Sequence, residues 1–65
     1  MPIVRAEIWK GRNTETKNAL AASITNAMVE HLGCPPDSVT VILKEVEKEH
    51  WFIGGENCEV KFPNR

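Results

Sequence analysis

The sequence has few of the residues that stabilise a small domain covalently or through a metal ion. Its 65 residues include two cysteines, Cys34 and Cys58, and no CxxC pair. His31 and Cys34 are three residues apart, but a structural zinc site needs four ligands and no second pair of ligands is present. We therefore expect two reduced, packed thiols, no metal and no cofactor.

The sequence also lacks a long apolar run and an excess of either charge. Eight Lys and Arg residues are balanced by nine Asp and Glu residues, and no basic cluster is present that would bind a phosphate backbone. Arg5, Glu7 and Lys10 interrupt the first ten residues, and no later stretch approaches the roughly 18 apolar residues of a membrane span. We expect no nucleic acid partner, no membrane association and a cytoplasmic location.

The chain is long enough for a single domain over residues 1–65 but not for a large core. A domain of about 60 residues buries only about 60% of the surface that its unfolded chain exposes. Ordering the chain costs about 1.5 kcal/mol per residue, which leaves an isolated subunit close to break-even. Because disulfides and a metal are disfavoured, self-association is the expected source of further stability.

The hydrophobic pattern predicts one β-α-β unit. Side chains alternate in polarity over Pro2–Trp9 and again over Ser38–Val46, which is typical of half-buried strands. Between them, an apolar stripe at helical spacing predicts a helix over Glu15–Leu32, with Asn13 or Thr14 as its N-cap and a glycine and two prolines after its end. A helix of about 27 Å can connect two parallel strands. The predicted fold class is therefore α/β (α+β), with parallel strands.

The C-terminal part is expected to form a short hairpin. Gly54 and Gly55 permit a tight turn between the bulky segment His50–Ile53 and the segment Cys58–Phe62, where apolar and charged residues alternate. An isolated two-stranded hairpin is marginal in water, and this one carries more aromatic surface than it can cover. We expect it to pack on a neighbouring subunit.

Two residues have side chains or positions that suit catalysis. Pro2 follows the initiator methionine, which is normally removed before a small residue, and its removal would expose a secondary amine. Such an amine is a useful general base when burial or nearby cations lower its pKa towards the working pH. Arg12 lies between the first strand and the helix, where its guanidinium could hold a carboxylate in a bidentate pair. Each residue also has a structural interpretation without a function. Pro2 would be an ordinary chain start, and Arg12 would be a solvated residue of a surface turn.

Several short segments together resemble the 4-oxalocrotonate tautomerase family. They are Met1-Pro2-Ile3-Val4 at the start, Gly11-Arg12 before the helix, Pro36-x-Ser38-Val39 before the second strand, and the segment from His50 to Gly55. The similarity extends to about Glu56. It implies a β-α-β subunit that forms dimers through its sheet and, commonly, a hexamer of three dimers. It also implies an amino-terminal proline, here Pro2, as the catalytic base and an arginine, here Arg12, that binds a substrate carboxylate.

Two positions depart from the family's best-known pattern. The family's second arginine, which polarises the substrate carbonyl from the second strand, corresponds to Thr40. The family's phenylalanine before Ile-Gly-Gly corresponds to Trp51, with Phe52 where glycine is common. A related dehalogenase branch has an arginine and an acidic residue at positions that look like Trp9 and Ile53, so hydrolytic dehalogenation is not expected. The candidate substrate-binding residues are Arg12, Thr40, Trp51, Trp9 and Ile53.

These residues support two hypotheses. The first is an isomerase that catalyses keto–enol or 1,3-/1,5-proton transfer on a small unsaturated 2-keto or 2-hydroxy acid. Without an arginine at position 40, the enolate oxygen would be stabilised by the Trp51 indole N–H, the Thr40 hydroxyl or water. The second is a non-catalytic ligand-binding or assembly subunit of the same fold. Retention of Met1 would favour the second, because the Pro2 nitrogen would then be an amide.

Overall fold

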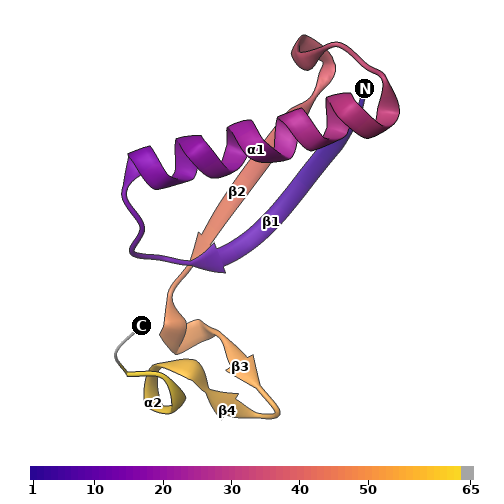
Figure 1. The fold of residues 1–65 in the computed structure, drawn as a ribbon. Helices are drawn as coiled ribbons and strands as arrows, with labels where there is room; N and C mark the ends of the chain where they lie inside the picture. The colour runs from indigo at the N-terminus through magenta and orange to yellow at the C-terminus, as the bar shows by residue number, and fades with distance from the viewer. Residues whose placement is uncertain (64–65) are drawn as a thin grey trace.

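The chain forms the predicted β-α-β unit. In the computed structural model, which describes residues 1–63, strands β1 (Ile3–Trp9) and β2 (Thr40–Val46) form a two-stranded parallel sheet. Helix α1 (Thr14–Leu32) connects them and lies across one face of the sheet (Figure 1). The parallel arrangement and the element order are confirmed, and the helix begins one residue earlier than predicted.

The two ends of α1 follow the signals in the sequence. The side chain of Asn13 is the N-cap and accepts a hydrogen bond from the backbone N–H of Thr16 at 2.8 Å. Gly33 ends the helix at φ 69°, a left-handed conformation that favours glycine, and its N–H donates to the carbonyl of Val29 at 3.0 Å. Pro36–Ser38 then forms a 3₁₀ turn (η1). Strand β2 therefore begins two residues later than predicted.

The two faces of the sheet differ in exposure. On the face towards α1, Val4, Ala6, Ile8, Val41 and Leu43 are half-buried. On the opposite face, which we call the open face, Ile3, Arg5, Glu7, Thr40, Ile42 and Lys44 are exposed. Ile3 remains 54% and Ile42 42% exposed. The open face is therefore partly apolar and carries unburied β-branched side chains.

The C-terminal part contains the predicted hairpin. After a 3₁₀ turn (η2, Lys48–His50), strands β3 (Phe52–Ile53) and β4 (Glu56–Asn57) pair in antiparallel fashion. Gly54 and Gly55 form the turn with φ of 61° and 82°, values at which a side chain would be strained. The hairpin lies beyond the end of β2, away from α1 (Figure 1). Its expected contact with a neighbouring subunit stays a prediction.

The prediction that Cys58–Phe62 forms the second arm of the hairpin is wrong, because Cys58–Lys61 is the short helix α2. The side chain of Asn57 caps this helix by accepting from the N–H of Glu59 at 2.9 Å. An alternating strand would place Val60 on the same face as Cys58, yet Val60 is 81% exposed and Cys58 is fully buried. Residues four apart share a helix face, so Cys58 and Phe62 lie on one side of this helical turn and Val60 does not.

The two cysteines agree with the prediction from composition. Cys34 and Cys58 are both free thiols, as predicted. Among the described residues, no helix combines the length and the apolarity that crossing a membrane requires.

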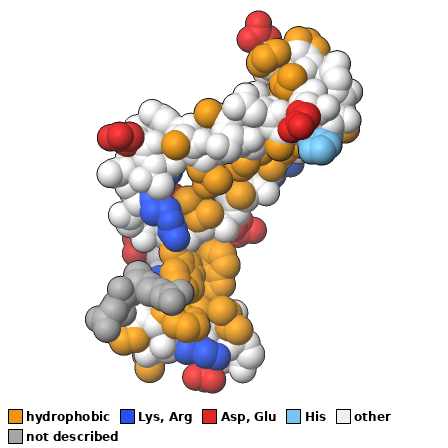
Figure 2. Space-filling view, in the orientation of Figure 1, with side chains coloured by type: hydrophobic (Ala, Val, Ile, Leu, Met, Phe, Trp, Pro, Cys, Tyr) orange, Lys and Arg blue, Asp and Glu red, His pale blue; other side chains and the backbone are white. Residues whose placement is uncertain are grey.

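A single subunit has almost no core of its own. Within residues 1–63, Cys58 is the only buried apolar side chain. The chain measures 42 × 25 × 14 Å, and its accessible surface of 4964 Å² exceeds the roughly 4,200 Å² typical of a compact monomer of this mass. Apolar side chains form a continuous band where the sheet meets the C-terminal part (Figure 2). Surface of this kind is normally covered by another subunit.

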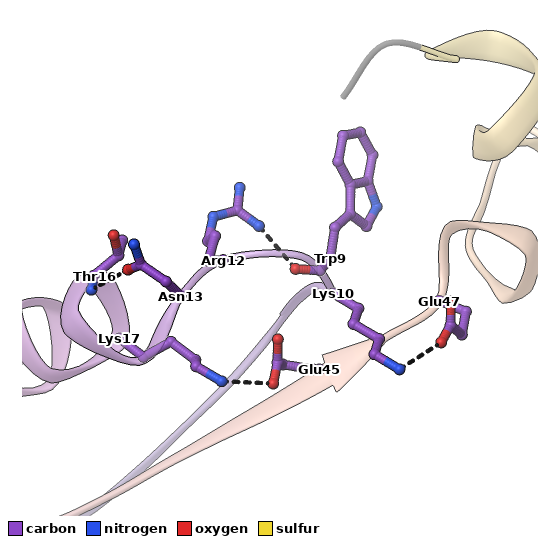
Figure 3. A network of polar contacts seen from close by, with 8 residues as sticks. All are labelled: Trp9, Lys10, Arg12, Asn13, Thr16, Lys17, Glu45 and Glu47. Carbon is purple, nitrogen blue, oxygen red and sulfur yellow. Dashed lines mark hydrogen bonds and ion pairs between the residues drawn. The ribbon is translucent and has the colours of Figure 1, made fainter.

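Two ion pairs fasten the connection between β1 and α1 to the end of β2 (Figure 3). The Nζ of Lys17 lies 2.8 Å from a carboxylate oxygen of Glu45, and the Nζ of Lys10 lies 3.1 Å from one of Glu47. The hydrogen bond from Lys17 holds the pKa of Glu45 below its usual range. The hydrogen bond to Glu47 raises the pKa of Lys10. These pairs fix the segment that carries Arg12.

The Lys17–Glu45 pair predicts a pH-dependent loss of stability. A carboxyl group with a lowered folded-state pKa stabilises the protein above its usual pKa, and this stabilisation is lost as the pH falls through the lowered value. Lys17→Met should therefore lower the melting temperature at pH 7 by a few degrees, as expected for a surface pair, and lower it by less at pH 3. Lys44→Met is the matched control, because Lys44 forms none of the ion pairs of residues 1–63. Equal losses at both pH values would contradict this assignment.

Candidate active site

Pro2 and Thr40 lie side by side at the end of the sheet where both strands begin. The carbonyl of Pro2 accepts a hydrogen bond from the backbone N–H of Thr40 at 3.0 Å, and Ile3 is opposite Thr40 in the register. Thr40 is exposed on the open face and Pro2 is half-buried. A ligand at the Pro2 nitrogen would therefore have the Thr40 hydroxyl as a neighbour.

Met1 precedes Pro2 in this structure and projects into solvent, with 91% of its surface exposed. While Met1 is attached, the Pro2 nitrogen is a tertiary amide, whose lone pair is delocalised into the carbonyl and cannot accept a proton at neutral pH. Removal of Met1 would convert it into a secondary amine. The exposure of Met1 leaves this peptide bond accessible to an aminopeptidase.

Arg12 lies in the connection that follows the opposite end of β1. Its Nη1 donates a hydrogen bond to the carbonyl of Trp9 at 2.8 Å (Figure 3). Gly11, immediately before it, has φ of 130°, a conformation that a residue with a side chain adopts only under strain. The remaining N–H groups of the guanidinium donate no hydrogen bond within the described chain.

A hollow of about 340 Å³ lies beside this connection, lined by Trp9, Lys10, Gly11 and Arg12. It combines two cationic side chains and an aromatic ring with Gly11, which has no side chain to fill the space. A guanidinium with free N–H groups binds a carboxylate through parallel hydrogen bonds, and an ammonium adds attraction. This hollow is suited to a small carboxylate.

An aromatic cluster joins this end of the sheet to the C-terminal part. The ring of Trp9 packs edge-on against Trp51, with centroids 6.1 Å apart, and at a tilt against Phe62, with centroids 5.6 Å apart. The Nζ of Lys48 lies 5.6 Å from the centroid of the Trp9 ring and donates to the carbonyl of Phe62 at 2.6 Å. Trp9 is thus a packing residue as well as a wall of the hollow.

The bulky residues of the C-terminal part differ in whether they line a groove. Trp51 and Phe52 line a groove of about 420 Å³ together with Glu7, Val46 and His50, on the side of the molecule where β2 ends. Ile53 is 45% exposed and is not among the residues that line this groove. Trp51 therefore lies with Arg12 and Trp9 at one end of the sheet, and Ile53 lies farther out on the hairpin.

The predicted site residues form two separate groups. Pro2 and Thr40 are at the start of the strands, and Arg12, Trp9 and Trp51 are at their end. A strand rises about 3.3 Å per residue, so the seven residues of β1 separate the groups by roughly 23 Å. A small molecule cannot contact both groups within one subunit. Among residues 1–63, no cluster of His, Cys, Asp and Glu side chains is arranged to hold a metal ion.

Comparison with known proteins identifies the family. The family model described as tautomerase enzyme matches residues 2–61. This chain belongs to the tautomerase family. The match covers both groups of site residues and begins at Pro2.

Individual relatives of this tautomerase agree with that assignment. The 2-hydroxymuconate tautomerase of Pseudomonas putida is 43% identical over 56 residues, which are 86% of this chain and 89% of the relative. The structure of a 4-oxalocrotonate tautomerase isozyme from Methylibium petroleiphilum superposes with a TM-score of 0.91 at 30% identity, over 98% of this chain and 100% of the other. A heterohexameric 4-oxalocrotonate tautomerase from Chloroflexus aurantiacus superposes with a TM-score of 0.85 at 33% identity, over 89% and 94%. The predicted 4-oxalocrotonate tautomerase family is confirmed, and family membership supports an isomerase of the tautomerase class.

The residues that hold the Arg12 segment of this tautomerase in place could not be found from its sequence. Lys17 and Glu45 are 28 residues apart, so no local pattern could have paired them. The Trp51 indole, the Thr40 hydroxyl and water stay the predicted alternatives for the donor to the enolate oxygen. A feature without a signal in the sequence is the indole nitrogen of Trp9, which is buried and has no hydrogen-bond partner in the described chain.

Proposed function

We propose that this chain, once Met1 is removed, moves a proton between two atoms of a small unsaturated 2-keto or 2-hydroxy acid, with the Pro2 amine as general base. The observation that carries this proposal is the position of Pro2, which lies at an open end of the sheet beside the exposed side chain of Thr40. It is supported by the family match, which begins at Pro2.

The chemistry requires Pro2 to be a neutral amine when substrate binds. An α-amino group has an ordinary pKa of about 8, so at pH 7 most of it would carry a proton. Nearby cations lower an amine's pKa because they disfavour the charged form. Lys10 and Arg12 are the cations that line the candidate carboxylate hollow, and bringing this hollow to Pro2 would lower the pKa of the amine.

The separation of Pro2 from Arg12 within one subunit supports a site in which a second subunit supplies the carboxylate-binding residue. Pro2 would take a proton from the substrate and return it to another carbon, while Arg12 of the partner subunit holds a carboxylate. Trp9, which lines the hollow, and Trp51, which packs against it, would supply apolar surface beside the substrate, and Ile53 would reach the substrate from farther out on the hairpin. The exposed apolar surface of the subunit supports association into dimers and further into hexamers, and a structural relative is named as a heterohexamer.

The developing enolate oxygen needs a hydrogen-bond donor in place of the arginine that corresponds to Thr40. A preorganised donor contributes about 2.7–4 kcal/mol to such a step. The Thr40 hydroxyl, beside Pro2, is the donor that the geometry favours. A hydroxyl gives weaker stabilisation than a permanent cation, so we expect lower turnover than in a relative with arginine at this position.

A non-catalytic ligand-binding or assembly subunit is the second candidate function. Thr40 in place of an arginine favours it, and retention of Met1, which would keep the Pro2 nitrogen an amide, would favour it further. The intact mass of the protein isolated from its natural host separates the two functions. A mass that includes Met1 would favour the non-catalytic subunit.

Pro2→Ala tests the general base directly. Met1 is also removed before alanine, so the variant presents a primary amine of different basicity and position. We expect kcat on 2-hydroxymuconate and on phenylenolpyruvate to fall about 10²–10⁴-fold, the usual contribution of a positioned base. Intact mass should show Met1 removed in both proteins, and the melting temperature should be unchanged. Equal turnover in the two proteins would rule out Pro2 as the base.

Arg12→Ala tests the carboxylate site. A carboxylate held in both the ground state and the transition state contributes mainly to KM. We expect KM for the dicarboxylate 2-hydroxymuconate to rise about 10–100-fold, the value of a charge-assisted hydrogen bond, with a smaller change in kcat. Arg12→Lys keeps the positive charge but lacks the planar guanidinium, so its KM should lie between the values of the parent and of Arg12→Ala. Identical constants for parent and Arg12→Ala would show that Arg12 is a solvated turn residue.

A further inference from the structure

The oxygen that gains charge in the proposed reaction would lie beside Pro2, where Thr40 offers an uncharged donor. When Pro2 takes a proton from the carbon next to a carbonyl, the C–H bond breaks, an N–H bond forms and the electron pair moves to the carbonyl oxygen. The charge returns to carbon when the proton is delivered there. A charged donor makes a hydrogen bond about twice as strong as a neutral one. A cation within reach of Thr40 would therefore lower the barrier further than the hydroxyl alone.

Two cationic side chains of residues 1–63 have no partner within that part of the chain. They are Arg5 and Lys44, and both are exposed on the open face of the sheet. The other Lys and Arg side chains of this part each interact with a carboxylate or a backbone carbonyl: Lys10, Arg12, Lys17, Lys48 and Lys61. Arg5 and Lys44 are therefore the cations of the open face.

Arg5 is nearer than Lys44 to the start of the strands. It is opposite Ile42 in the parallel register, and Thr40 precedes Ile42 by two residues. With strands about 4.8 Å apart and a rise of about 3.3 Å per residue, the Cα atoms of Arg5 and Thr40 are roughly 8 Å apart, a diagonal that long side chains bridge. Lys44 lies four residues beyond Thr40, roughly 13 Å along β2. Arg5 is thus the unpaired cation closest to Thr40 on this face.

No polar partner within residues 1–63 holds the Arg5 guanidinium away from Pro2. Ile3 is the next residue of the open face towards Pro2 and is 54% exposed. The apolar stem of Arg5 can lie along Ile3 while the charged head extends past it. Towards Glu7 and Lys44, Arg5 borders a hollow of about 350 Å³, so its side chain is not fixed by packing there. Glu7 is opposite Lys44 in the register and forms no ion pair with Arg5.

We propose that Arg5 is a catalytic residue, whose guanidinium donates a hydrogen bond to the enolate oxygen that develops beside Pro2 and Thr40. The inference rests on the proposed function and deepens it, because it assigns the charge that balances the enolate. Arg5 and Pro2 are consecutive parts of one chain end, so both come from the same subunit. Arg12 would hold the carboxylate of the substrate and Arg5 its enolate oxygen. The site therefore suits a 2-keto acid with one carboxylate, since each of the two anionic groups has its own arginine.

Removal of the Arg5 charge tests this role in the protein with Met1 removed. For Arg5→Gln we expect kcat on phenylenolpyruvate to fall at least about tenfold, because loss of one preorganised donor costs up to about 10³-fold. Lys44→Gln is the matched control, because it removes the same charge from the same face, and its kcat should stay within about threefold of the parent. A loss below about tenfold in Arg5→Gln, or an equal loss in Lys44→Gln, would overturn the inference.

An arginine introduced on the neighbouring strand distinguishes a catalytic role of Arg5 from a structural one. Thr40→Arg places a guanidinium where that of Arg5 is proposed to act. It should therefore raise kcat at least about tenfold more in the Arg5→Gln protein than in the parent, because residues that contact one group are not additive. An equal effect in the two proteins would show that positions 5 and 40 act independently, which would contradict the proposal.

Binding of oxalate tests the contact without turnover. One carboxylate of oxalate takes the place of the substrate carboxylate, and an oxygen of the other lies where the enolate oxygen would develop. Arg5→Gln should weaken oxalate binding at least about tenfold, the value of a charge-assisted hydrogen bond, and should change binding of acetate, which lacks the second group, by less than about threefold. NMR titration gives both dissociation constants. Equal changes for oxalate and acetate would show that Arg5 does not contact the second group.

Native mass and melting temperature establish that each variant is folded and assembled. Where Arg5→Gln does not match the parent in both, Arg5→Met, which keeps the apolar stem, takes its place with the same expected values. Pro2→Ala separates the inference from the proposed function. Turnover retained in Pro2→Ala would count against the proposed base alone, and the oxalate titration would still decide the role of Arg5. Turnover lost in Pro2→Ala but kept in Arg5→Gln would overturn the role of Arg5 alone.

Discussion

The parallel pairing of β1 with β2 determines where every candidate site residue lies. Because both strands run in one direction, Pro2 and Thr40 meet at their start, and the connection with Arg12 meets the aromatic cluster at their end. A parallel pair requires a long crossover, and α1 supplies it while covering a single face of the sheet. The other face and the edge of β1 are left for neighbouring subunits. The proposed catalysis and the expected assembly thus depend on the same pairing.

The small hydrophobic core also results from the arrangement of one helix against a two-stranded parallel sheet. With one helix on one side of two strands, the chain cannot enclose its apolar side chains, and the only buried one in residues 1–63 belongs to the C-terminal part. The aromatic contacts of Trp9 with Trp51 and Phe62 hold this part to the sheet. A surface that stays apolar in the isolated subunit stabilises the protein only when another copy covers it. The site proposed at the subunit boundary would then form only in the assembled protein.

The sequence was sufficient to predict the elements that depend on local interactions. Three such signals were confirmed: the alternation over Pro2–Trp9, the helix cap at Asn13 and the helix end at Gly33. The strand predicted over Cys58–Phe62 was wrong because five residues are too few to distinguish a period of two from a helical turn. The residues of the site could be named from the resemblance, but their distance could not, because it depends on the direction of the strands and on a second subunit.

The central claim is that one site takes Pro2 from one subunit and Arg12 from another. Mixing the Pro2→Ala and Arg12→Ala proteins, dissociating them and allowing them to reassociate tests it most directly. Random reassociation makes about half of the pairs mixed, each with one intact site, so activity should recover to about a quarter of the parent's. With 2-hydroxymuconate well below the KM of Arg12→Ala, each variant treated alone should keep only a few per cent of the parent's activity. Activity that never exceeds the mean of the two variants would show that Pro2 and Arg12 do not act together across subunits.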